Sequence, residues 1–232
     1  MDALPEPRYT VAVLTVGVLI SGSGTNLQAI LDRVGDGSLP VRIGVVISNR
    51  AGVRGLERAE MAGVPTRVMD HRGHARREDY DAALVDALRT AGVGLVVLAG
   101  FDRLVTRVLL EAFPQRVINI HPALLPAFKG LHAQRQAVEY GVRIAGATVH
   151  FVDESVDHGP IILQGAVAIA PDDDVDAVTA RILEVEHQLY PAAIRLFAED
   201  RLRIDGRRVV IDGTPTPLPP PLLPVPKSSI GA

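Results

Sequence analysis

The sequence contains no cysteine and no tryptophan, and aromatic residues make up only 4% of its 232 positions. Without cysteine there can be no disulfide framework, no thiolate nucleophile and no cysteine-ligated zinc site. So few aromatic side chains argue against a platform that stacks single-stranded bases. The formal net charge of −3 likewise lacks the basic excess typical of proteins that bind nucleic acid or an anionic membrane surface.

Long apolar runs are also missing. No run reaches the about 18 residues that a transmembrane helix requires. The N-terminal stretch MDALPEPRYT carries acids and prolines where a secretory signal peptide would need basic residues followed by an apolar segment. We therefore expect a cytoplasmic protein with no membrane partner, and 232 residues suffice for one large domain with a substantial core.

Apolar, β-branched runs alternate with helical patterns through the first half of the chain. We expect strands at 15–21, 42–48, 65–70, 94–100 and 117–120, and helices at 25–34, 53–63, 78–92 and 103–113. Such alternation predicts βαβ units, and hence an α/β fold whose central sheet is mostly parallel with helices on both faces. Strands that are apolar throughout fit central strands buried on both sides.

The pattern changes in the C-terminal half. We expect a helix near 131–140, two pairing strands at 145–154 and 160–169, a long helix at 174–198, and short strands at 201–205 and 207–212. The acidic run 172–174 suits the positive end of the long helix. We expect residues 1–212 to form a single domain, with 1–12 as an N-terminal extension, and the proline-rich segment 213–232 to form a mobile tail.

The first candidate site is the turn within 19-LISGSGTNLQAI-30, between an expected strand and an expected helix. Gly22 and Gly24 can adopt positive φ and let a ligand approach the backbone. Thr25 or Asn26 would cap the helix, so that free N–H groups and the helix dipole point at an anion such as phosphate. The turn lacks the third glycine of a dinucleotide fingerprint and the lysine of a P-loop, so an ordinary βα turn would also explain it.

The second candidate site lies at the end of the fifth expected strand, in 117-VINIHPALLPAFKG-130. Asn119 and His121 are two residues apart, so their side chains lie on the same side of the strand. Ligands of parallel sheets gather beyond the carboxyl ends of the strands, where this pair is expected. Asn can donate to a developing oxyanion, and His can supply a proton or a positive charge near neutral pH.

The third candidate site is the loop within 148-TVHFVDESVDHGPI-161, which carries Asp153, Glu154 and Asp157. A carboxylate from this loop could polarise His121 across the cleft, raise the pKa of the imidazole and favour its protonated form. The pattern does not say which of the three acids points inward. The residues alone therefore predict an α/β enzyme with a phosphate-sized pocket and a centre of Asn, His and a carboxylate.

Together these motifs resemble the glycinamide ribonucleotide formyltransferases of the folate-dependent formyltransferase superfamily. The resemblance covers roughly residues 14–212 and rests on LISGSGTN, SNR, LAGFDRL, NIHPALLP, TVHFVD and EVEHQLYP, in the family's order. It implies a Rossmann-like formyltransferase fold with antiparallel additions in the C-terminal half. It also implies transfer of a formyl group from 10-formyltetrahydrofolate to the amine of glycinamide ribonucleotide, the third step of purine (IMP) synthesis, without a metal or a covalent enzyme intermediate.

The resemblance also assigns individual residues. Asn119, His121 and Asp157 match the family's catalytic residues. The matches for substrate binding are Gly22, Ser23, Gly24, Thr25 and Asn26 for the ribonucleotide phosphate, and Glu186 for the ribose hydroxyls. The matches for the folate site are Arg77, Arg103, Leu104, Val105, Asn119, Glu154 and Asp157, and Thr148 and His150 match positions beside the catalytic residues. Three positions depart from the family's pattern: Asp102, where many relatives carry an apolar residue, Val105, where leucine is common, and His158, where glycine is common.

Other interpretations use the same residues. Within the superfamily, a formyltransferase for a sugar-nucleotide amine and a formyltetrahydrofolate hydrolase are alternatives, whereas a methionyl-tRNA formyltransferase would need a further domain and a basic surface. A metal-dependent hydrolase using His121, His132, His150 and Asp157 would lack a closely spaced ligand pair such as His-Glu-x-x-His. A non-catalytic ligand-binding module would have no need of a matched amide, imidazole and carboxylate. The family includes monomers and dimers, which leaves a homodimer open.

Overall fold

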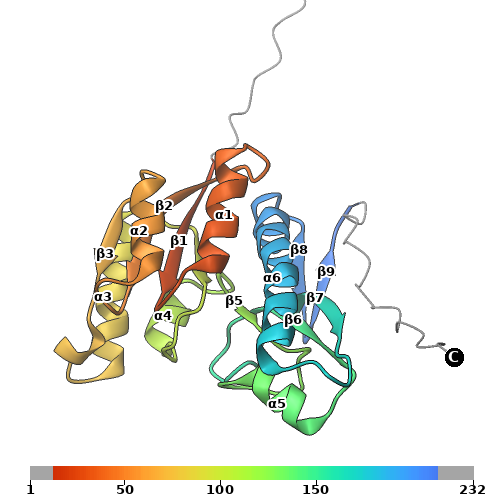
Figure 1. The fold of residues 1–232 in the computed structure, drawn as a ribbon. Coiled ribbons are helices and arrows are strands. Elements are labelled where there is room, and N and C mark those ends of the chain that lie inside the picture. The colour runs from red at the N-terminus through yellow and green to blue at the C-terminus, as the bar shows by residue number, and fades with distance from the viewer. Residues whose placement is uncertain (1–12, 214–232) are drawn as a thin grey trace, which may run out of the picture.

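The computed structural model describes residues 13–213. The predicted extension at 1–12, and all but the first residue of the predicted tail at 213–232, lie outside this part of the chain. In chain order the elements are β1 (Leu14–Ile20), α1 (Thr25–Gly35), β2 (Val41–Ser48), α2 (Arg54–Met61), β3 (Thr66–Val68), the short 3-10 helix η1 (His71–Gly73), α3 (Arg77–Thr90), β4 (Leu95–Leu98), α4 (Arg107–Ala112), β5 (Val117–His121), α5 (Ala133–Tyr140), β6 (Ile144–Phe151), β7 (Ile161–Ala168), α6 (Val175–Ala198), β8 (Leu202–Asp205) and β9 (Arg208–Ile211). The strands form one sheet in the order β3-β2-β1-β4-β5-β6-β7-β9-β8 (Figure 1).

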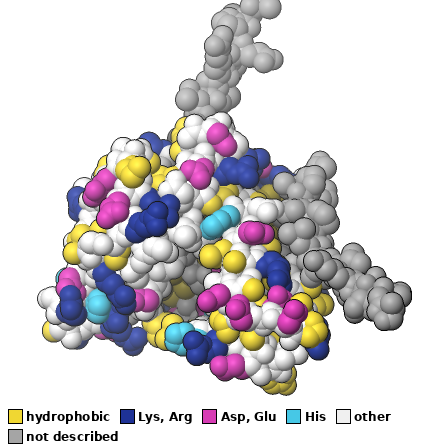
Figure 2. Space-filling model, viewed as in Figure 1, with side chains coloured by type: hydrophobic (Ala, Val, Ile, Leu, Met, Phe, Trp, Pro, Cys, Tyr) yellow, Lys and Arg dark blue, Asp and Glu magenta, His cyan; other side chains and the backbone are white. Residues whose placement is uncertain are grey.

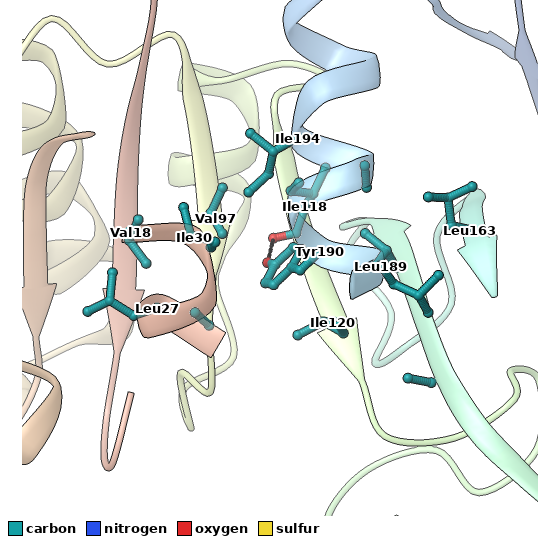
Figure 3. Packing of buried hydrophobic residues seen from close by; sticks show 14 of the residues in the cluster. Val18, Leu27, Ile30, Val97, Ile118, Ile120, Leu163, Leu189, Tyr190 and Ile194 are labelled. Atoms are coloured by element: carbon teal, nitrogen blue, oxygen red, sulfur yellow. Dashed lines mark hydrogen bonds between the residues drawn. The ribbon is translucent and has the colours of Figure 1, made fainter. Parts of the chain in front are cut away.

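The first five strands run parallel and form the half of the sheet that the alternating pattern predicts. β1, β2, β4 and β5 are buried along almost their whole length, because helices cover both faces. On one face, α1 and α6 pack around Val18, Leu27 and Ile194 (Figure 3). On the other face, α3 and α4 contribute Leu84 and Leu109 to a second apolar cluster. The predicted α/β sheet with helices on both faces is confirmed.

One helix is shorter than the sequence pattern predicts. The pattern indicates a helix over 103–113, but α4 begins only at Arg107. The buried carboxylate of Asp81 accepts the backbone N–H of Thr106, which fixes the residue ahead of the helix in an extended conformation. Residues 99–106 therefore form a loop at the carboxyl end of β4. No helix within residues 13–213 is long and apolar enough to cross a membrane.

The C-terminal half adds antiparallel strands, as predicted. β6 pairs with β5 and with β7 in antiparallel register, so the expected strand pair extends the parallel sheet. The β5–β6 register places His150 opposite Asn119 and Thr148 opposite His121. Polar residues from two distant segments thus meet at the end of β5.

The long helix α6 ties the two halves of the sheet together. Asp174 caps the helix by accepting the N–H of Ala177, in agreement with the predicted acidic start. Further along, the fully buried hydroxyl of Tyr190 lies 2.8 Å from the carbonyl oxygen of Leu98 and 3.1 Å from that of Ile118 (Figure 3). The Tyr190 side chain therefore joins α6 to the last residue of β4 and to Ile118 of β5, which directly precedes Asn119.

Candidate active site

His121, the last residue of β5, has both ring nitrogens engaged by the protein. Its Nε2 lies 2.8 Å from the carbonyl oxygen of Phe128, and its Nδ1 lies 3.3 Å from Oδ2 of Asp157. A carbonyl oxygen only accepts, so Nε2 carries a hydrogen. The Nδ1 atom of this buried ring faces the carboxylate.

Asp157 is the carboxylate of the 148–161 loop that points inward. Its Oδ2 accepts the backbone N–H of Gly130 at 2.8 Å as well as contacting His121. Burial raises the pKa of the Asp157 carboxyl, but the neighbouring His150, the Gly130 N–H and the charge of His121 outweigh burial, so the pKa lies below its usual value. The backbone of Asp157 has φ of 45°, an uncommon left-handed conformation for a residue with a side chain.

The two other acids of this loop point elsewhere. Asp153 pairs with His158 at 2.8 Å, and the exposed Glu154 lies 3.3 Å from the guanidinium of Arg107. The residue pattern did not say which of the three acids points inward. The conformation of the loop places Asp157 there.

Asn119 directs its amide at His150. The distance from Asn119 Nδ2 to His150 Nε2 is 3.3 Å, and His150 Nδ1 lies 2.8 Å from the carbonyl oxygen of Phe151. A carbonyl oxygen only accepts, so Nδ1 of His150 carries a hydrogen; in the tautomer without a hydrogen on Nε2, that nitrogen accepts one of the two Asn119 amide hydrogens. The second amide hydrogen stays available to a ligand. His150 Nε2 is also 3.7 Å from Asp157 Oδ1, so Asn119, His121, His150 and Asp157 form one cluster.

Thr148 supports the cluster indirectly. Its buried hydroxyl donates to the carbonyl oxygen of Ala123 at 2.6 Å and accepts the N–H of Leu125 at 3.0 Å. Gln164 on β7 donates to the same hydroxyl and to the carbonyl oxygen of Leu125, each at 3.0 Å. These bonds hold the chain that leaves β5. The sequence analysis missed Gln164, although a lone amide within the apolar run of β7 was a usable signal.

The turn between β1 and α1 differs from the prediction in detail. Gly24, with φ of 67°, is the N-cap residue, so neither Thr25 nor Asn26 caps the helix, and Gly22 keeps φ outside the left-handed region. A Cβ on Gly24 would lie 2.6 Å from the Cα of Gly55, because α2 packs directly against the turn. With no side-chain cap, the first N–H groups of α1 remain available to an anion.

Two neighbours fix this turn from outside it. Arg58 on α2 donates to the carbonyl oxygen of Ser23 and to Oε1 of Gln28, both at 2.9 Å; the sequence analysis did not single it out. On the other side, Asn26 donates to Oε2 of Glu186 at 2.8 Å. Burial, partly offset by the Asn26 hydrogen bond, raises the pKa of Glu186 to about 7. Asn26 and Glu186 come from α1 and α6, and the structure brings them together.

The residues matched to the folate site fall into two groups. Arg77, Arg103 and Leu104 line a common cavity of about 250 Å³ together with Tyr80 and Asp81. Basic side chains and a histidine gather at the lower left of Figure 2, where Figure 1 places the start of α3. Within residues 13–213, neither Arg77 nor Arg103 forms a salt bridge, so two guanidinium groups are free to bind an anion.

The other residues matched to the folate site lie outside this cavity. Val105 packs against the apolar cluster of α3 and α4, and Glu154 pairs with Arg107 at the surface. Among the described residues, no three His, Asp or Glu side chains are arranged to hold a metal ion.

Comparisons with known proteins identify the family of this chain. Residues 14–194 match the formyl transferase family. The phosphoribosylglycinamide formyltransferase of Haemophilus influenzae is 42% identical over 202 residues, which cover 87% of this chain and 95% of that protein. The trifunctional purine biosynthetic protein adenosine-3 of Drosophila pseudoobscura is 48% identical over 202 residues, but the match spans only 14% of its length. The crystal structure of glycinamide ribonucleotide transformylase 1 from Symbiobacterium toebii has a TM-score of 0.85 at 58% identity, covering 86% of this chain and 94% of that one.

Proposed function

This chain belongs to the formyl transferase family, and we propose that it transfers the formyl group of 10-formyltetrahydrofolate to the amine of glycinamide ribonucleotide. The relatives from Haemophilus and Symbiobacterium, which it matches over 95% and 94% of their lengths, carry the names of this activity. The observation that carries the proposal is the convergence of Asn119, His121 and Asp157 at the end of β5. The reaction would serve the third step of purine synthesis, in the cytoplasm.

The reaction is a direct transfer between two bound substrates. The neutral amine of the ribonucleotide attacks the formyl carbon, a new C–N bond forms, and the carbonyl electrons move to the oxygen. The tetrahedral intermediate then collapses, the bond to N10 of the folate breaks, and N10 takes up a proton while the amine loses one. No enzyme nucleophile is needed, which is consistent with a chain that has no cysteine.

Asn119 and His121 would stabilise the oxyanion of that intermediate. The free amide hydrogen of Asn119 is one donor. The Nε2–H of His121 is the other, and the oxyanion would replace the carbonyl oxygen of Phe128 as its acceptor. Donors aimed at the developing charge typically contribute about 3–4 kcal/mol each to the transition state.

Asp157 would hold the His121 ring in its orientation. Its carboxylate lies 3.3 Å from His121 Nδ1, and its lowered pKa keeps it ionised near neutral pH. The ion pair is shielded from solvent, since the two side chains are 6% and 11% exposed. A buried imidazolium needs such a partner, because an unpaired buried charge is strongly unfavourable. The His150 ring, held by Asn119 and Phe151, would complete the wall behind this pair.

The neighbouring sites fit the two substrates. The uncapped N-terminus of α1 would bind the ribonucleotide phosphate, with Glu186 accepting hydrogen bonds from the ribose. The cavity lined by Arg77 and Arg103 would bind the carboxylates of the folate glutamate. The pterin would lie along the loop that contains Leu104 and Val105.

The proposal is tested by mixing the purified protein, without added metal and with a chelator, with both substrates. Release of tetrahydrofolate that depends on glycinamide ribonucleotide is the expected result. Release without the ribonucleotide would instead indicate a hydrolase, and activity only with a sugar-nucleotide amine would indicate a different formyltransferase. Loss of activity on chelation that zinc restores would indicate a metal-dependent enzyme.

A further inference from the structure

Asp102, one of the departures from the family's pattern, connects three loops. Its Oδ1 accepts hydrogen bonds from the hydroxyl of Ser21 and from Nδ2 of Asn49, both at 2.8 Å. Its Oδ2 accepts from the guanidinium of Arg50. The backbone N–H of Asp102 also donates to the Ser21 hydroxyl at 3.0 Å. One carboxylate therefore accepts hydrogen bonds from two other segments of the chain, one with Ser21 and one with Asn49 and Arg50.

These segments lie side by side at the carboxyl edge of the sheet. Ser21 follows β1, Asn49 and Arg50 follow β2, and Asp102 follows β4, and these strands are neighbours in the order β2-β1-β4. The backbone bond from Ser21 N–H to the Gly100 carbonyl oxygen, at 3.0 Å, continues the β1–β4 contact up to this point. Through its hydrogen bond with Asn49, the Asp102 side chain also connects this edge to the segment that follows β2.

The buried donors depend most on the carboxylate. Ser21 is 5% exposed and Asn49 is 1% exposed, and the Asp102 carboxylate accepts a hydrogen bond from each of them. The Asn49 Oδ1 atom already has no hydrogen-bond partner among the described residues. The Arg50 side chain is 58% exposed, and an exposed ion pair of this kind contributes little by itself. The hydrogen bonds from Ser21 and Asn49 therefore contribute most of the stabilisation that this cluster provides.

The positions of these residues connect the cluster to substrate binding. Ser21 directly precedes the segment Gly22–Asn26, which we propose binds the ribonucleotide phosphate. Asp102 directly precedes Arg103, which lines the cavity proposed for the folate glutamate. A loop that is no longer held against the other can adopt positions in which its contacts with substrate are not made, so both binding sites would be weakened.

We propose that Asp102 is a positioning residue that holds the ribonucleotide loop and the folate loop in a fixed relation, so that its loss weakens the binding of both substrates together. The inference rests on the proposed function, because it assigns one loop to each substrate. An apolar residue at this position could not link the loops in this way, since it accepts no hydrogen bond. If Asp102 acted only within the folate pocket, its loss would raise the KM for the folate and leave the KM for the ribonucleotide unchanged.

The test compares the steady-state kinetics of the wild type, Asp102→Asn and Ser21→Ala. The concentration of each substrate is varied in turn. Asn at position 102 has a single neutral oxygen and presents an NH₂ group to one of the donors. We expect its KM for both substrates to rise about tenfold, the change expected on losing a hydrogen bond to a charged group. The kcat should be unchanged, because only binding is affected. Ser21→Ala should raise both KM values by a smaller factor.

Asp173→Asn is the matched control. The Asp173 carboxylate also accepts several donors, from Arg181 and from the N–H of Ala170, and it is largely buried. It precedes α6 and contacts neither loop, so its loss should leave both KM values unchanged. Thermal unfolding verifies that each variant is folded, and Ser21→Ala carries the test if Asp102→Asn does not fold.

Two outcomes would overturn the inference alone: unchanged KM values in the folded variant, or a rise for one substrate only. A fall in kcat at unchanged KM would also overturn it, because that result indicates a general loss of active protein. A wild type without ribonucleotide-dependent activity would overturn the proposed function and this inference with it.

Discussion

Replacing Glu186 by Gln removes the titration of a carboxyl that is buried between α6 and α1. The Glu186 side chain is 4% exposed and accepts a hydrogen bond from Asn26. Burial raises its pKa from 4.5 to about 7, and the Asn26 bond offsets burial only in part. Gln has nearly the same size and keeps an oxygen for Asn26 to donate to, so the substitution isolates the effect of the charge.

The magnitude follows from the pKa change. A pKa that rises from 4.5 to about 7 on folding corresponds to about 3 kcal/mol, because each pKa unit is worth about 1.4 kcal/mol. The folded state holds this proton more tightly than the unfolded state. The contribution of Glu186 to stability is therefore fully present below pH 4.5, falls as the pH rises to about 7, and then levels off.

Urea unfolding of the wild type and of Glu186→Gln, repeated from pH 4.5 to pH 8, measures how the contribution of Glu186 to stability changes with pH. The free energy of unfolding of Glu186→Gln minus that of the wild type should grow by about 3 kcal/mol from pH 4.5 to pH 8. Glu184→Gln, which changes an exposed carboxyl on the same helix, is the control. A difference for Glu186→Gln that does not change with pH would refute the reasoning.

Three further predictions concern the catalytic cluster and the core. Asn119→Ala and Asp157→Asn should each lower turnover by about 100-fold or more with folding retained; near-wild-type rates in either would remove that residue from the mechanism. Gly24→Ala places a Cβ 2.6 Å from the Cα of Gly55 at φ of 67°, so we expect about 1 kcal/mol or more of destabilisation and a raised ribonucleotide KM; an unchanged urea midpoint and KM would contradict this. Tyr190→Phe removes the buried hydroxyl that lies between two strand carbonyls and should cost about 1–2 kcal/mol in urea unfolding at unchanged KM; wild-type stability would show that this bond contributes nothing.

Most of the fold could be predicted from local patterns. The expected strand at 42–48 is observed at Val41–Ser48, and the expected helix at 174–198 is observed at Val175–Ala198. Burial repeats at the period of each element, so the type of element can be recognised from a short window of sequence. The helix expected over 103–113 was too long at its start because Asp81, from another segment, takes the amide that precedes α4.

The residue types of the candidate site could be predicted from the sequence, but the contacts between these residues could not. Asn119 and His121 lie on one strand two residues apart, so their shared side follows from strand geometry alone. Asp157 could be preferred over Asp153 and Glu154 only through the family resemblance, because the acids share one loop and the same chemistry. The role of Asp102 was not visible from its neighbours in sequence.

The sequence by itself determined the order of elements, the mostly parallel sheet and the edge at which polar groups collect, since each depends on periodicity within one segment. The tertiary structure decided which groups contact one another. The Asn26–Glu186 bond joins residues 160 positions apart, and the Ser21–Asp102 bond spans 81 positions. Partners so far apart are selected by the packing of whole elements, and that packing also sets the burial that raises the pKa of Glu186.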